Sequence, residues 1–116
     1  QIGEYTIHTD QPTHGGGDGT APSPFILFLA SLGTCAGIFI KSFCDSRGIS
    51  SEKIEIIQKL EFDRGSNRIS KVILEVQLPS DFPEKYKDAV LLSANQCAVK
   101  QYLANPFEVE SVAVFK

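Results

Sequence analysis

The segment from Gly19 to Ile40 carries no charged residue, and it constrains the fold more than any other feature of the chain. Its most apolar part, residues 25–40, is shorter than the ~20 residues that a helix needs to cross a bilayer. Ser23 is a favourable N-cap, Pro24 suits the first helical position, and Gly48 can adopt the left-handed conformation that ends a helix. Because apolar residues lie on all sides, we expect a central helix buried in a protein core rather than a membrane span.

Two strands are predicted after this helix. Apolar and polar residues alternate along residues 53–63 and again along residues 69–78, which is the period of a half-buried strand. The sequence Arg64-Gly65-Ser66-Asn67 between them has the composition of a turn. We therefore predict an antiparallel hairpin.

The remaining elements lie on either side of this hairpin. Residues 2–9 and 108–115 have the composition of a first and a last strand, and residues 11–21, with a run of glycines, form a loop. Helical residues run from about 83 to 104, with a break at Asn95 and a separate helix from Gln96.

The predicted order is strand, helix, strand, strand, helix, strand. This order predicts an α+β protein in which helices back an antiparallel sheet, and on order alone it also allows a ferredoxin-like split βαβ arrangement. A length of 116 residues suits one domain over residues 1–116. Because the chain begins with Gln1 and not with methionine, we expect the natural protein to extend further upstream.

Composition restricts the partners and the compartment. The net charge of −3 offers no basic surface for nucleic acid. Three cysteines are an odd and sparse set for a secreted disulfide scaffold, and no signal-peptide pattern is present. We therefore expect reduced thiols in the cytoplasm, with no nucleic acid or membrane as partner.

The cysteines are the main candidates for chemistry. Cys35 lies in the apolar helix and Cys97 opens a second helical run, so the two thiols could meet across a core and form a disulfide. Cys44 lies nine residues after Cys35, about 13.5 Å further along the helix axis. Since a disulfide requires Cα atoms within roughly 7 Å, the pairs left open are Cys35 with Cys97 and Cys44 with Cys97. Inert buried thiols explain the same pattern.

A redox role requires a thiolate. Cys97, in the first turn of its helix, could have its pKa lowered by free backbone N–H groups. Cys35 lies about three turns inside its own helix, so we expect it to need a nearby cation.

Several stretches resemble the OsmC/Ohr family, which comprises osmotically inducible protein C and the organic hydroperoxide resistance proteins. The stretches are residues 15–24 with the glycine run, residues 29–35 ending in Cys35, Gly48-Ile49, and residues 94–99 around Cys97. The two cysteines are also separated by 62 positions (35 to 97), which fits the family.

The resemblance implies an intertwined homodimer in which the helices of the first cysteine pack together and two active sites lie at the interface. It implies that Cys35 is the peroxidatic thiol and Cys97 the resolving thiol. Cys35 would attack a small hydrophobic hydroperoxide, Cys97 would close the disulfide, and a dithiol reductant would reopen it. Neither a metal nor a cofactor is implied.

Two departures from the family leave a second hypothesis open. The family's peroxidases carry a glutamate directly after the proline, where this chain has Phe25, and an arginine from the N-terminal region, whereas residues 1–46 here contain none. A non-catalytic dimer that binds a hydrophobic small molecule is therefore the alternative. A ferredoxin-like sensor domain is a third hypothesis, and it predicts that Cys35 and Cys97 lie apart.

Other polar residues give weaker signals. His8 and His14 show no known metal-ligand spacing, and no Gly-Lys-Ser/Thr follows the glycine run to hold a phosphate. Arg47 is the only arginine near the apolar helix, but it lies at the end remote from Cys35.

Overall fold

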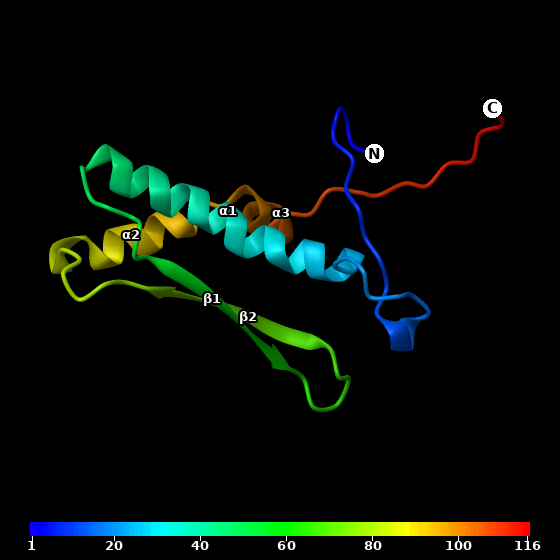
Figure 1. The fold of residues 1–116 in the computed structure, drawn as a ribbon, viewed down its shortest axis with the longest axis horizontal. Helices are drawn as coiled ribbons and strands as arrows, with labels where there is room; N and C mark the ends of the chain where they lie inside the picture. Colours follow the sequence, from blue (N-terminus) through cyan, green and yellow to red (C-terminus); the bar gives the residue numbers. More distant parts are fainter. The chain divides into compact units, whose positions relative to one another are not determined.

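The uncharged segment forms one long helix, α1 (Pro24–Ser46), in the computed structural model, which describes residues 1–116 (Figure 1). The Ser23 hydroxyl oxygen accepts a hydrogen bond from the Ile26 N–H at 3.3 Å, as an N-cap does. The predicted start of the helix is therefore confirmed.

The end of α1 is confirmed as well. Gly48 has a φ of 66°, in the left-handed region, and the Ile49 N–H donates to the Cys44 carbonyl at 2.9 Å. This pairing across six residues is the Schellman motif, which satisfies a carbonyl that the helix leaves free.

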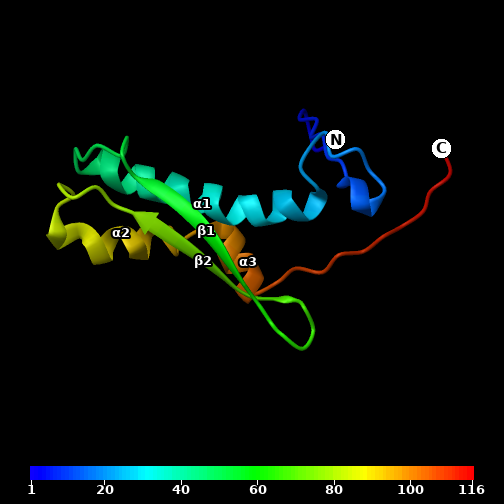
Figure 2. The ribbon, with the colours of Figure 1, turned by 60° about the horizontal axis from the view of Figure 1, so that its bottom comes forward.

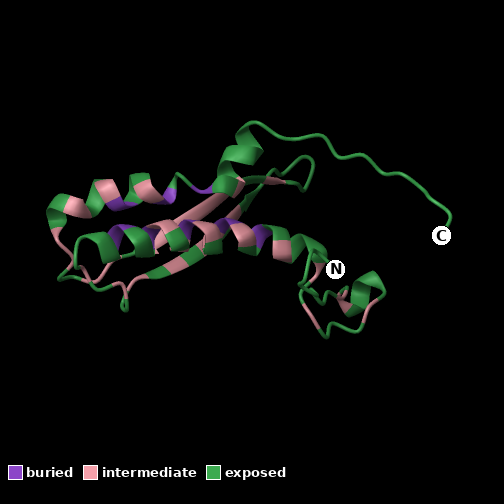
Figure 3. Cartoon of the chain, turned by 90° about the horizontal axis from the view of Figure 1, so that it is seen from above, coloured by how far each residue is buried: buried purple, intermediate pink, exposed green.

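Only one side of α1 is buried within the chain, which corrects the prediction of a helix buried all round (Figure 3). The opposite side exposes Ile38, and the first turns of the helix expose Phe25, Ile26 and Phe28, because one copy of the chain has too few elements to cover them. The buried residues are Leu29, Leu32, Ala36, Ile40, Phe43 and Cys44.

By length and composition, α1 is long and apolar enough to cross a membrane. The core helix of a soluble protein meets the same criterion, so length and composition do not separate the two environments. The expectation that the protein has no membrane partner stays a prediction.

The predicted hairpin is confirmed. β1 (Glu55–Phe62) and β2 (Ile69–Gln77) pair antiparallel, with Ile56 opposite Val76 and Leu60 opposite Val72 (Figure 2). These apolar pairs share one face because side chains alternate along a strand.

The chain forms two compact units, each of which combines two stretches of sequence. Residues 1–34 and 55–77 make the first unit. In it, Gln58 of β1 approaches α1 closely, since a Cβ at Gly33 would lie 3.3 Å from the Gln58 side-chain oxygen. Glycine at position 33 therefore permits the close approach of strand and helix.

Residues 35–54 and 78–116 make the second unit, which contains η2 (Glu84–Tyr86), α2 (Lys87–Ala94) and α3 (Ala98–Ala104). The interruption between α2 and α3 lies where the sequence predicted it. Val90 of α2 is fully buried, which stabilises the fold by about 1.5–3 kcal/mol relative to an exposed side chain. The expectation of a single domain stays a prediction.

The two predicted terminal strands are absent, so those predictions were wrong for the single chain. Residues 2–9 make only an isolated bridge between Ile2 and Tyr5, and residues 105–116 form no helix or strand. Val109 and Val114 are each 84% exposed. A strand needs a neighbouring strand for its backbone hydrogen bonds, and these segments have none.

The α+β class is confirmed, but the two-stranded sheet excludes the four-stranded ferredoxin-like arrangement.

The glycine run lies in a loop, as predicted, and Asp10 organises it around a short 3-10 turn, η1 (Thr13–Gly15). The Asp10 carboxylate accepts hydrogen bonds from the backbone N–H groups of Gln11, Asp18 and Thr20. These bonds lower the pKa of Asp10, with the Thr20 N–H as the largest cause. Asp10 thus pairs with backbone N–H groups of the loop that would otherwise have no partner in the chain.

Candidate functional site

The structure brings Cys35 and Cys97 together. Cys35 lies on α1 in the second unit and is half-buried. The Cys97 thiol and the backbone N–H groups of Val99 and Ala98 lie close enough to its sulfur to lower its pKa. Both cysteines are free thiols in this structure. Their contact contradicts the sensor-domain hypothesis, which required them to lie apart.

Cys97 owes its position to the break between α2 and α3. It is the N-cap residue of α3, in an extended conformation with φ −52° and ψ 128°, and its carbonyl accepts the Gln101 N–H at 3.1 Å. The side chain is only 2% exposed. The break therefore turns the Cys97 thiol inward onto α1 and directs the first N–H groups of α3 toward Cys35.

The two thiols differ in acidity. The hydrogen bond from Cys97 is the largest cause of a lowered Cys35 pKa, and the N–H groups of Val99 and Ala98 lower it further. Burial raises the pKa of Cys97, and the neighbouring Cys35 raises it again. When the pair loses its first proton, Cys35 becomes the thiolate and Cys97 keeps its proton to donate to it.

This result reverses the sequence-based expectation about which thiol the second helix would activate. The N–H groups of Ala98 and Val99 lower the pKa of Cys35, which comes from another helix. On Cys97 itself, burial and the Cys35 thiol outweigh the lowering by nearby backbone N–H groups. No lysine or arginine contributes to the lowered pKa of Cys35. The backbone of Ala98 and Val99 was missed because a sequence gives no sign of which side chain faces a helix terminus.

Cys44 has a different environment. Its side chain is fully buried, and burial is the largest cause of its raised pKa, followed by the negative charge of Asp45. The thiol that neighbours Cys97 and acts on its pKa is Cys35 and not Cys44, which favours the first of the two pairings that the sequence left open. Cys44 is a core residue, as one of its two sequence interpretations had it.

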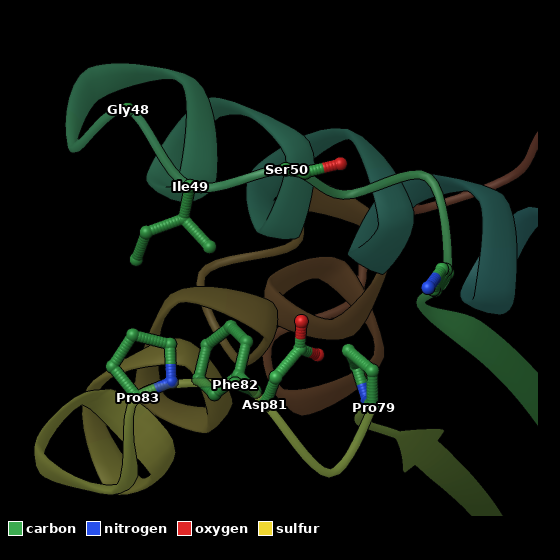
Figure 4. A pocket seen from close by; sticks show the side chains of 8 residues that line it. Gly48, Ile49, Ser50, Pro79, Asp81, Phe82 and Pro83 are labelled. Carbon is green, nitrogen blue, oxygen red and sulfur yellow. The ribbon is translucent and has the colours of Figure 1, made fainter.

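Two hollows lie in the second unit. One is lined by residues of α1 and α2 together with Arg47 and Gln96. The other lies between the segments that follow α1 and β2, and Figure 4 shows Asp81 and Phe82 at its wall. Lys53 also lines this second hollow, but it forms no ion pair with Asp81.

No group of three or more His, Cys, Asp or Glu residues converges to hold a metal.

The sequence profile of the OsmC-like protein family matches residues 16–112. This chain belongs to the OsmC-like family. The match includes both Cys35 and Cys97. No curated protein matches the chain.

Two solved structures share the fold. One is a Psychrobacter arcticus protein named for osmotic stress induction and a detoxification response; it is 22% identical, with a TM-score of 0.67 over 80% of this chain and 68% of that one. The other is a Legionella pneumophila protein described as an organic hydroperoxide resistance protein, OsmC; it is 20% identical, with a TM-score of 0.53 over 87% of this chain and 75% of that one. At these identities the likeness establishes the fold alone.

Proposed function

We propose that this OsmC-like protein is a thiol-dependent peroxidase that reduces organic hydroperoxides through a Cys35–Cys97 dithiol–disulfide cycle. One observation carries the proposal: two neighbouring thiols, of which the more accessible has a lowered pKa and the buried one a raised pKa. A peroxidatic cysteine must be a thiolate, and a resolving cysteine must keep a proton until the first has been oxidised.

The first step consumes the hydroperoxide. The Cys35 thiolate attacks the terminal oxygen of ROOH, the O–O bond breaks, and the electron pair leaves on RO⁻, which takes a proton to become the alcohol. Cys35 is then a sulfenic acid. The Cys97 sulfur attacks the Cys35 sulfur, the S–O bond breaks, and water leaves as the disulfide forms.

The second step restores the thiols. An external dithiol attacks the disulfide, passes through a mixed disulfide, and leaves as its own oxidised form. Such a reductant is available in a reducing compartment, so we place the protein in the cytoplasm. We infer a small hydrophobic hydroperoxide as substrate, since apolar side chains such as Phe39 flank Cys35 on α1.

We also propose that the functional unit is a homodimer. α1 exposes Phe25 and Phe28 near its start and Ile38 on the side opposite its buried residues, and the exposed terminal segments alternate apolar residues without a strand to pair with. Exposed apolar surface of this kind is typical of protein interfaces. A second copy could cover α1 and give the terminal segments their strand partners. Sedimentation equilibrium that reports only monomer at micromolar concentration would contradict the dimer.

The alternative is a non-catalytic dimer that binds a hydrophobic small molecule. The observation in its favour is that Phe25 replaces the family's glutamate and that no cation contributes to the lowered pKa of Cys35. In this alternative the thiol pair would react with hydroperoxides no faster than free cysteine does.

The test treats the reduced protein with one equivalent of cumene hydroperoxide and maps the peptides by mass spectrometry. We expect a rapid and quantitative Cys35–Cys97 disulfide. Cys44→Ser is the matched control and should form the same disulfide, whereas Cys97→Ser should stop at the Cys35 sulfenic acid, which dimedone traps. Slow oxidation spread over all three cysteines would reject the peroxidase and favour the binding dimer.

A further inference from the structure

The geometry of the thiol pair depends on the link between α2 and α3, which is residues 95–97. Asn95 ends α2 in a helical conformation, and its N–H donates to the carbonyls of Leu91 and Leu92 at 3.3 and 3.2 Å. Cys97 then opens α3 in an extended conformation. The chain therefore changes direction within the link, and this change decides where the Cys97 thiol and the first N–H groups of α3 lie.

α3 is too short to fix its own direction. It has seven residues, and an isolated helix of fewer than ~12 residues is marginal in water without tertiary contacts. None of its own residues is buried within the chain, although Cys97, its N-cap residue, is. Side-chain bonds from α3 across the link are therefore important for its direction.

Two side chains of α3 reach back over the link. Lys100 Nζ donates to Asn95 Oδ1 at 2.7 Å, and Gln101 Nε2 donates to the Gln96 carbonyl at 3.3 Å. The first bond is short and charge-assisted, so it is the stronger of the two. Both bonds join residues five positions apart, one on each side of Cys97, so they connect the start of α3 to the end of α2.

The groups that act on Cys35 are the ones that this link carries. The Cys97 thiol and the first N–H groups of α3 lower the pKa of Cys35, whereas burial raises it. No charged side chain contributes to the shift, and Lys100 is no exception. We therefore expect Lys100 to act on Cys35 through the position of α3 and not through its own charge.

We propose that Lys100 and Asn95 are positioning residues, whose hydrogen bond holds the link in the direction that places Cys97 next to Cys35. This inference rests on the proposed function and deepens it. After Cys35 has become a sulfenic acid, the same bond keeps the Cys97 sulfur within reach, so that the disulfide forms and water leaves. Without the bond, a second hydroperoxide has more time to transfer its oxygen to the sulfenic acid, which gives a sulfinic acid and a second alcohol.

The measurement is the rate at which iodoacetamide alkylates Cys35 over a pH series, which requires no hydroperoxide. Lys100→Met should move the midpoint of this profile to higher pH by about 0.3–0.7 unit, because one exposed bond sets only part of the position of α3. Asn95→Ala removes the acceptor but keeps the charge of Lys100, and it should give the same shift. The double variant should shift no further than either single variant, since all three remove the same bond.

Two further variants serve as controls. Lys41→Met breaks a bond of the same length, 2.7 Å to Asp45, which lies within α1 and does not cross the link, so the profile should stay unchanged. Lys100→Arg keeps a charged donor and should restore most of the original profile. A general loss of stability would not reproduce this pattern, because the folded chain would keep its Cys35 environment.

Three results would each overturn the inference. They are an unchanged profile in both Lys100→Met and Asn95→Ala, a shift in Lys100→Met alone, which would mean that charge acts directly, and an equal shift in Lys41→Met. Turnover of cumene hydroperoxide is read separately. The expected shifts in a chain without turnover would contradict the peroxidase and leave the positioning role standing. In a chain with turnover, Lys100→Met should also accumulate more Cys35 sulfinic acid per cycle, as read from peptide masses.

Discussion

Cys35 and Cys44 lie on the same helix, nine residues apart, yet their surroundings act on them in opposite directions. Cys35 is half-buried and accepts hydrogen bonds from Cys97 and from the start of α3, which lower its pKa. Cys44 is fully buried beside a carboxylate, and its pKa is raised. The comparison teaches that the reactivity of a thiol is not decided by the helix that carries it. It is decided by the hydrogen-bond donors that other elements place next to the thiol.

The largest expected effect comes from replacing each thiol in turn. Cys35→Ser should reduce the turnover of cumene hydroperoxide, measured with excess dithiothreitol, to the background rate, because the attacking thiolate is lost. Cys44→Ser should retain turnover, since Cys44 has no role in the cycle. If Cys44→Ser abolished turnover in a folded protein, the contrast between the two thiols would be wrong.

The next effect is the order in which the thiols react as pH rises. Because the pKa of Cys35 is lowered and those of Cys97 and Cys44 are raised, Cys35 should become a thiolate at the lowest pH. Iodoacetamide should therefore alkylate Cys35 first, as read from peptide masses over a pH series. In Cys97→Ala the largest donor is gone, and the alkylation profile of Cys35 should move to higher pH. An unchanged profile would show that the Cys97 thiol does not set the acidity of Cys35.

A smaller effect separates stability from reactivity. Gly48→Ala forces alanine into the left-handed conformation that ends α1 near Cys44, which should destabilise the fold by about 1 kcal/mol. Urea unfolding would measure this loss. The Cys35 alkylation profile should not move, because Gly48 lies three turns beyond that thiol. A shift of both quantities would show that the two ends of α1 are coupled.

The smallest effect concerns the charge beside Cys44. Asp45→Asn removes a secondary cause of the raised Cys44 pKa and breaks the exposed pair between Lys41 and Asp45, at 2.7 Å, which contributes little to stability. Burial remains as the main cause, so Cys44 should stay unreactive toward iodoacetamide at neutral pH. Rapid alkylation of Cys44 in this variant would mean that charge, and not burial, protects it.

The sequence predicted the elements whose signals are local. Ser23 and Gly48 bound α1 correctly, because capping depends on residues within one turn of the helix end. The turn at residues 64–67 and its flanking alternation predicted the hairpin, and Asn95 marked the break before α3. The chain's membership of the OsmC-like family also followed from short motifs around Cys35 and Cys97.

The predictions failed for segments whose structure depends on a partner that is remote in the sequence. The alternating residues 2–9 and 108–115 fit a strand, but alternation does not supply the neighbouring strand that would bond their backbones. For the same reason, α1 is apolar all round while one copy of the chain buries only one side of it.

The sequence by itself determined which thiols this protein has, that they lie on separate helices, and where those helices begin and end. Only the tertiary structure decided that Cys97 turns inward onto Cys35, that the Ala98 and Val99 N–H groups approach its sulfur, and that the Arg47 guanidinium lies over the Phe43 ring. The physical reason is the distance along the chain over which the interactions act: caps and turns involve only a few neighbouring residues. The acidity of a thiol and the orientation of a guanidinium depend on groups that only packing brings near.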